Sequence, residues 1–197
     1  MSGIDVLVVG GGLHGLSAAL HLARRGCRVR VLEAQQVGAH ASGYSAGGVR
    51  TLGRHAAEVP LALEALERWH DILALVGDAC GFRSVGQVQV AENPDELARL
   101  AERAAQMRAL GFVHEEVVET QALRRLLPAV ADHVVGGLVA RRDGFATPLR
   151  TTQAFCRAAQ AAGVEVVEGA RVAGVERRAG CWTLRTRDCL LYTSRRG

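Results

Sequence analysis

The sequence predicts an α/β fold that opens with a β-α-β unit, and three observations near the N-terminus support this prediction. A short, nearly continuous apolar run from Ile4 to Val9 is typical of a parallel strand that is buried on both faces. Apolar residues then recur at helical spacing up to Arg25, and Gly26 follows where a left-handed cap can end a helix. A second apolar run, Val29 to Leu32, completes the unit.

A glycine-rich turn joins the first strand to the helix, and its spacing predicts a dinucleotide-binding site. Gly10, Gly12 and Gly15 satisfy the Gly-x-Gly-x-x-Gly pattern between a predicted strand and a predicted helix. They permit a tight turn, close approach of the backbone to a pyrophosphate, and close packing of helix on strand, respectively. The pyrophosphate is expected at the N-terminus of the helix, where N–H groups and the helix dipole favour an anion.

An acidic residue, Glu33, ends the second predicted strand. We expect it to accept hydrogen bonds from the adenosine ribose hydroxyls, and its charge would repel a 2′-phosphate. The alternative interpretation is a structural glycine turn beside a surface glutamate.

The next part of the chain is expected to hold one irregular loop, one helix and one strand. Residues 38–48 are too rich in glycine and other small residues for regular structure. Pro60 stands where a proline is tolerated early in a helix, and apolar residues recur at helical spacing from Leu61 to Val76. This predicts a single helix. The alternation in residues 85–90 predicts a strand.

Asn93 opens the next predicted helix, because it can cap the helix and is followed by Pro94 and two acids at the positive end. We expect this helix to end at Gly111. Beyond it we predict strands over 112–118, 134–140, 164–167 and 181–187, helices over 120–127 and 147–163, and a turn at 143–144. Strands and helices alternate less regularly here, which indicates a second, mixed domain inserted in a nucleotide-binding domain.

The composition is that of a globular protein, with 49% hydrophobic and 22% charged residues and a mean hydropathy of +0.10. No apolar run approaches the ~20 residues needed to cross a bilayer, so no membrane partner is expected. The N-terminus also lacks the basic residues of a signal peptide. These features favour a cytoplasmic protein.

The charge pattern does not favour nucleic acid as a partner, although the net charge is +4. All 24 basic residues are Arg, they are scattered among 20 acids, and aromatic residues make up only 4% of the chain. Any charged clamp for a carboxylate must therefore be an arginine. The five cysteines form no Cys-x-x-Cys pair and the histidines are scattered, so we expect free thiols and no metal site.

A small-residue loop with the sequence ASGYSAGGVR, at 41–50, resembles the second flavin-contacting loop of a known superfamily. This is the FAD-dependent glycine oxidase, D-amino-acid oxidase and sarcosine oxidase superfamily, with the glycine oxidase and sarcosine oxidase β-subunit branch the most similar. Asp143-Gly144 followed by Thr147-Pro148 is similar to the family's return from the substrate domain to the FAD domain. Residues 169–172 are similar to its adenine-contacting segment.

The resemblance implies a Rossmann-like FAD-binding domain with an inserted α+β substrate domain, C-terminally truncated, because the family continues beyond this C-terminus. We expect FAD-binding parts at 1–80 and 143–188 and the first part of the substrate domain at 81–142. Residues 189–197 are expected to be a non-native tail, because their start resembles the translated end of a transposon-based sequencing adapter. The 197-residue chain alone is then expected to bind FAD weakly and to show no turnover.

The resemblance also implies a reaction, namely oxidation of the C–N bond of an amine or amino acid of the glycine, sarcosine or D-amino-acid type. Hydride transfer to flavin N5 would give an imine that hydrolyses, and a small amine or amino acid is the expected partner. A flavin enzyme acting on a hydroxy acid or alcohol and an inactive nucleotide-binding fragment are the alternatives.

The residues expected to contact FAD lie in the glycine turn, after the second strand, in the small-residue loop and in the adenine-contacting segment: Gly10, Gly12, Leu13, His14, Gly15, Glu33, Ala34, Ser42, Ala46, Gly47, Gly48 and Val172. Arg50 follows the Gly-Gly that should abut the flavin, so its guanidinium is a candidate to hold a substrate carboxylate or to compensate negative charge on reduced flavin. The alternative for Arg50 is a surface or packing role.

Overall fold

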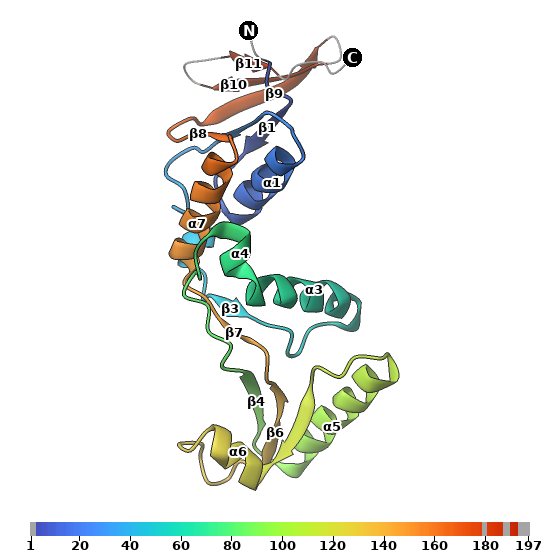
Figure 1. The fold of residues 1–197 in the computed structure, drawn as a ribbon. Helices are drawn as coiled ribbons and strands as arrows, with labels where there is room; N and C mark the ends of the chain where they lie inside the picture. The colour runs from blue at the N-terminus through green and yellow to red at the C-terminus, as the bar shows by residue number, and fades with distance from the viewer. Residues whose placement is uncertain (1–2, 179–180, 187–189, 193–197) are drawn as a thin grey trace. The chain divides into compact units, whose positions relative to one another are not determined.

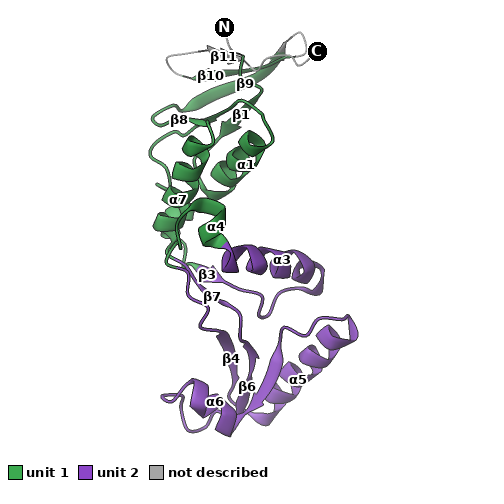
Figure 2. Ribbon diagram, in the orientation of Figure 1, with its two compact units in different colours: residues 1–47, 72–81, 147–197 green, residues 48–71, 82–146 purple. Residues whose placement is uncertain are grey.

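The computed structural model describes residues 3–178, 181–186 and 190–192, and the chain divides into two compact units (Figure 2). Unit 1 draws on residues 1–47, 72–81 and 147–197, and unit 2 on residues 48–71 and 82–146. These units group residues by packing, so the predicted domain limits 1–80, 81–142 and 143–188 stay predictions. No helix in the described ranges has both the length and the apolar character needed to cross a membrane.

Unit 1 is built on a parallel sheet in which β1 (Val6–Val9), β2 (Val29–Leu32) and β8 (Glu165–Val167) lie in the order β1-β2-β8. The register pairs Val6 with Val29 and Arg30 with Glu165. Helix α1 (Leu13–Arg24) connects β1 to β2 (Figure 1). Parallel strands need such a crossover, so the predicted β-α-β unit is confirmed.

Helix α7 (Pro148–Ala161) packs against α1, and the short helices α2 (Ala41–Tyr44) and α4 (Ile72–Val76) pack against α7. The prediction that 38–48 holds no regular structure is therefore wrong at α2. The carbonyl oxygen of Ser42, in α2, accepts a hydrogen bond from Thr152 Oγ1 of α7. This contact and packing against a long helix explain how a glycine-rich loop can hold a helical turn.

An antiparallel meander follows in unit 1, with β9 (Val172–Arg178), β10 (Cys181–Thr186) and β11 (Leu190–Tyr192) in the order β11-β10-β9. Strand β9 was not predicted; most of its side chains that the structure describes are exposed, so it shows no clear apolar alternation. Of the predicted non-native tail, 190–192 form β11, while Cys189 and 193–197 lie outside the described residues.

Unit 2 contains an antiparallel sheet of β4 (Gln87–Ala91), β6 (Gly136–Ala140) and β5 (Glu116–Glu119), with β6 in the centre. Helix α5 (Pro94–Ala109) packs on the face that carries Leu138, and α6 (Thr120–Leu126) packs on the face that carries Val139. Successive strand residues point to opposite faces, so the two helices cover opposite sides of the sheet. The Asn93 cap is confirmed, because its side chain accepts a hydrogen bond from Glu96 N.

The remaining elements of unit 2 are the strand pair β3 (Gly48–Val49) and β7 (Gly144–Phe145), the 3-10 helix η1 (Ala56–Glu58) and helix α3 (Val59–His70). The single helix predicted from Pro60 to Val76 is wrong, because the chain leaves the helix at Asp71, with φ −104° and ψ 15°, before α4 begins. Aspartate is among the residues with low intrinsic helix propensity, and an apolar period alone does not report this.

Candidate functional site

The glycine turn of unit 1 lies between β1 and α1, and its geometry requires small residues. Gly10 has a φ of +105°, in the region that favours glycine. A Cβ on Gly15 would lie 2.1 Å from the carbonyl oxygen of Gly10, so helix and turn approach too closely for any side chain. A Cβ on Gly12 would lie 2.9 Å from Ser42 Oγ. The tight turn predicted at Gly10 and the close packing predicted at Gly15 agree with these contacts, whereas the approach of a pyrophosphate to Gly12 stays a prediction.

The N-terminus of α1 presents N–H groups that the protein only partly uses. The Leu13 N–H donates to Ser42 Oγ at 3.0 Å, but the N–H groups of His14 and Gly15 have no protein acceptor among the described residues. Gly12 caps the helix without a side-chain hydrogen bond, and no acidic residue lies in the first turn. The positive end of the helix dipole is thus left for an external anion, which fits the pyrophosphate of a dinucleotide.

Glu33 is buried beside this turn, with 7% of its surface exposed. Its Oε2 accepts a hydrogen bond from Gly11 N at 2.7 Å, and its Oε1 accepts one from Gln35 N at 2.8 Å. Each carboxylate oxygen can accept more than one hydrogen bond, so a ribose hydroxyl can still be bound. The structure therefore adds a role that the sequence did not predict, because Glu33 also fixes the main chain of the glycine turn.

The predicted adenine-contacting segment lies beside the residues that follow β2. Ala170 N donates to the carbonyl oxygen of Glu33 at 2.8 Å, and Gly169 N donates to that of Gln35 at 3.0 Å. Glu33 and Ala34 are thus brought next to a segment more than 130 positions away in the sequence. Val172, further along, is half-buried and begins β9, where it pairs with Thr186.

The small-residue loop is divided between the two units. Ser42, Ala46 and Gly47 belong to unit 1, and Gly48 and Arg50 belong to unit 2. Ser42 is joined directly to the glycine turn through its bond from Leu13, whereas Ala46 is exposed and Gly47 has a φ of +72°. Gly48 begins β3, where it pairs with Phe145 of β7.

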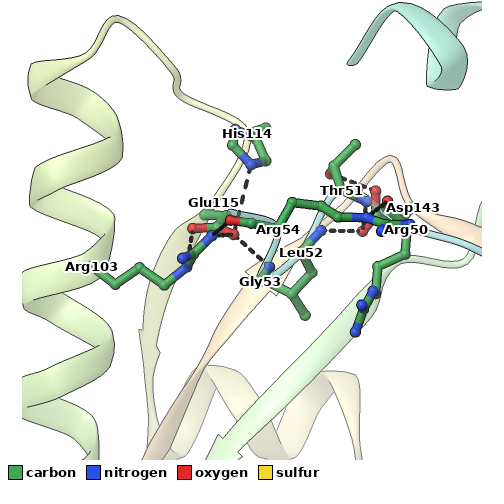
Figure 3. Close-up of polar contacts among 9 residues, drawn as sticks. All are labelled: Arg50, Thr51, Leu52, Gly53, Arg54, Arg103, His114, Glu115 and Asp143. Atoms are coloured by element: carbon green, nitrogen blue, oxygen red, sulfur yellow. Dashed lines mark hydrogen bonds and ion pairs between the residues drawn. The ribbon is translucent and has the colours of Figure 1, made fainter. Parts of the chain in front are cut away.

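In unit 2, the main chain on both sides of Arg50 is fixed while its side chain is exposed (Figure 3). Val49 pairs with Gly144 in the β3–β7 ladder. On the other side, Thr51 N donates to Asp143 Oδ2 at 2.8 Å, and Arg54 Nε donates to the carbonyl oxygen of Arg50 at 3.3 Å. The Arg50 guanidinium makes no hydrogen bond or ion pair with any residue that the structure describes.

Two buried acids near this segment were not predicted as functional residues. Asp143 is fully buried and accepts hydrogen bonds from Thr51 N, Thr51 Oγ1 and Leu52 N at 2.8, 2.6 and 2.9 Å. Glu115, whose side chain is also fully buried, pairs with Arg103 and accepts a hydrogen bond from Gly53 N at 2.7 Å. The sequence offered one hint of the role of Glu115, namely an acid inside the segment 112–118 that was predicted to be a strand. In the structure the strand covers only Glu116–Glu119, so Glu115 lies just before it.

Within the described ranges, no group of three or more His, Cys, Asp or Glu side chains is arranged to hold a metal ion. Binding chemistry of other kinds is offered by the N-terminus of α1 with the N–H groups of His14 and Gly15, called the cradle below, and by the exposed guanidinium of Arg50 in unit 2.

Comparison with known proteins identifies relatives of this chain. It is 32% identical over 159 residues to gamma-glutamylputrescine oxidoreductase of Escherichia coli, covering 74% of this chain and 37% of that protein. It is 29% identical over 185 residues to glycine oxidase of Bacillus licheniformis, covering 89% and 48%. The crystal structure of glycine oxidase from Bacillus cereus matches with a TM-score of 0.85 at 23% identity, covering 95% of this chain and 52% of that one. The chain thus spans about half or less of the length of these proteins.

The model of one protein family, DAO, described as FAD dependent oxidoreductase, matches residues 5–193. This match and the structural likeness confirm the predicted superfamily, the α/β fold class and FAD as the cofactor of the family. The glycine turn and the open N-terminus of α1 are features that such a cofactor requires. The chain belongs to the DAO family of FAD-dependent oxidoreductases.

Proposed function

We propose that the cradle of unit 1 binds FAD, with its pyrophosphate at the N-terminus of α1. The N–H groups of His14 and Gly15, which have no acceptor among the described residues, support this proposal because they can donate to phosphate oxygens. Glu33 would hold the adenosine ribose with the lone pairs that Gly11 and Gln35 leave unused. The open end of α1 is the observation that carries this proposal.

We further propose that the protein oxidises the C–N bond of an amine or amino acid. Bound FAD would supply the two-electron acceptor, which takes the hydride at N5. The contribution of the protein is then to bind and orient the substrate. Arg50 is our candidate for holding a substrate carboxylate, because its main chain is fixed, its guanidinium has no partner among the described residues, and a guanidinium binds a carboxylate through two parallel hydrogen bonds.

The names of the relatives also support this substrate class. Glycine oxidase of Bacillus licheniformis and sarcosine oxidase subunit beta of Rhizobium meliloti, 29% and 26% identical to this chain, are named for amino-acid substrates. Because the chain spans less than half of either protein, their activities come to it only as a proposal.

The test has a binding arm and an activity arm. In the first, FAD is titrated into this chain and into Gly12→Ala, whose Cβ would push against Ser42, with Ala18→Ser at an exposed position of α1 as the matched control. We expect saturable FAD binding by the original chain and by the control, and weaker binding by Gly12→Ala. Equal FAD binding by all three proteins would refute the cradle as the FAD site.

The activity arm uses the complete product of the gene that encodes this chain, loaded with FAD. Flavin reduction without oxygen, and peroxide formation in air, are measured with amines, amino acids and hydroxy acids. We expect amines or amino acids to reduce the flavin. Reduction by hydroxy acids alone would favour the alternative substrate class, and FAD binding without reduction by any compound would favour a non-catalytic nucleotide-binding protein.

A further inference from the structure

Two buried carboxylates from distant parts of unit 2 bind the same short stretch of main chain, residues 51–53 (Figure 3). Asp143 lies just before β7, and Glu115 lies just before β5. Between them they accept hydrogen bonds from three consecutive main-chain N–H groups, those of Thr51, Leu52 and Gly53. This stretch follows Arg50 directly.

Asp143 depends on this stretch for the solvation of its charge. It is fully buried, and no arginine or histidine pairs with it among the described residues. A buried carboxylate is costly unless hydrogen bonds replace its water, and the three hydrogen bonds that the Asp143 carboxylate accepts in Figure 3 come from Thr51 and Leu52. The next residue, Gly144, pairs with Val49. Asp143 and Gly144 thus hold the main chain immediately after and immediately before Arg50.

Glu115 provides the second anchor, together with an arginine of α5. Arg103 donates to both carboxylate oxygens of Glu115, from Nε at 3.0 Å and from Nη2 at 2.9 Å. Its Nη2 also donates to the carbonyl oxygen of Arg54 at 2.7 Å. Arg54 in turn donates from Nε to the carbonyl oxygen of Arg50. The peptide group that joins Arg50 to Thr51 is therefore held at both its carbonyl oxygen and its N–H.

We propose that Asp143 and the Arg103–Glu115 pair are positioning residues, which fix the main chain at 50–54 so that the Arg50 guanidinium is presented to a carboxylate. This inference rests on the proposed function of Arg50. An arginine side chain loses conformational freedom when it binds, and a fixed main chain reduces the further ordering that binding requires. Neither acid needs to touch the ligand.

The experiment measures carboxylate binding without turnover, with acetate as the probe. Acetate is titrated by calorimetry into the FAD-loaded chain and into the variants Arg50→Ala, Asp143→Ala, Asp143→Asn and the double variant Arg50→Ala/Asp143→Ala. Asp143→Asn can keep all three contacts, because its amide oxygen can accept both N–H groups while its NH₂ group donates to the Thr51 hydroxyl. Asp132→Ala, at an exposed acid of the same unit, is the matched control. Hydrogen exchange at Thr51 and Leu52 is followed in every protein.

We expect Asp143→Ala to weaken acetate binding about five- to tenfold and to speed exchange at Thr51 and Leu52. Asp143→Asn should bind acetate within about twofold of the original chain, and the double variant should be no weaker than Arg50→Ala alone, because both changes remove the same interaction. The proposal is overturned if Asp143→Ala keeps its acetate affinity while exchange rises, if its effect adds fully to that of Arg50→Ala, or if no protein binds acetate.

The failure of the proposed function has a different signature. If Arg50→Ala leaves acetate binding unchanged while Asp143→Ala speeds exchange, the main chain is anchored as described but Arg50 does not bind carboxylates. If Asp143→Ala does not unfold the chain and exchange at Thr51 and Leu52 stays slow, the anchoring itself is refuted, whatever Arg50 does.

Discussion

Replacing Glu33 with glutamine is the sharpest test of the cofactor site, because it changes one atom in a buried position. In the structure both carboxylate oxygens accept main-chain N–H groups, from Gly11 at 2.7 Å and from Gln35 at 2.8 Å. The side-chain amide of Glu33→Gln has one acceptor oxygen and one NH₂ donor group. It can therefore accept from only one of the two N–H groups, and its NH₂ faces the other.

The cost of this mismatch can be estimated from the geometry. A buried N–H that loses its acceptor costs about 1–3 kcal/mol, and hydrogen bonds to charged groups lie at the upper end of the usual range. If Gly11 is the unsatisfied donor, the turn that holds the pyrophosphate is displaced. The substitution also removes the negative charge that is expected to bind the ribose hydroxyls. A loss of about 1–3 kcal/mol in FAD binding is about a 5- to 150-fold increase in Kd.

The assay is a titration of FAD into the chain, followed by flavin fluorescence, beside thermal unfolding without FAD. Glu165→Gln is the matched control, since Glu165 lies on β8 of the same sheet but pairs with Arg30 at the surface. We expect the control to bind FAD within about twofold of the original chain. A Glu33→Gln chain that kept both its FAD affinity and its unfolding temperature would refute the reasoning.

Three further predictions concern other parts of the chain. Gly15→Ala should lower the free energy of unfolding by about 1–3 kcal/mol, measured by urea denaturation, because its Cβ would lie 2.1 Å from the Gly10 carbonyl oxygen. Arg50→Lys in the complete gene product should raise KM for amino acids more than for amines without a carboxylate, because lysine keeps the charge but not the paired hydrogen bonds; equal effects would indicate a packing role. The pKa of Asp78 is lowered by the Cys80 N–H and by Arg150 and Arg157, so its stabilising contribution is present at neutral pH and is lost as the pH falls through the lowered pKa. The difference in Tm between the original chain and Asp78→Asn should therefore shrink below about pH 4, and a difference that grew in acid would contradict this.

The part of the fold that could be predicted depends on residues close together in the sequence. The strand, glycine turn, helix and second strand are each specified by local signals, as is the Asn93 cap with its hydrogen bond from Glu96. The break at Asp71 was missed, because the apolar period continues across it from α3 into α4. Strand β9 was missed because none of its described side chains is fully buried, so the sequence gives no clear alternation of apolar and polar residues there.

The residues of the candidate site likewise fall into those that local sequence signals predicted and those that depend on distant contacts. The glycines and Glu33 could be named because a dinucleotide imposes their spacing. The Ser42 hydroxyl that meets Leu13 N could be named only through the resemblance of its loop. Nothing in the sequence predicted the partners of Asp143, because its donors, Thr51 and Leu52, are about 90 residues away.

This division has a physical cause. A phosphate-binding turn can be recognised from its own residues, since each glycine is required by local steric contacts and so recurs at a fixed spacing in the sequence. A buried carboxylate such as Asp143 or Glu115 needs hydrogen-bond donors that only the folded chain brings to it. Its residue type cannot predict burial, because an acidic residue is equally suited to the surface. Arg50 lies between these cases. Its neighbouring glycines mark the loop. What distinguishes it from other surface arginines is that Asp143 anchors the main chain at Thr51, while the Arg50 guanidinium has no partner among the residues that the structure describes. That distinction makes Arg50 a testable candidate for holding a substrate carboxylate.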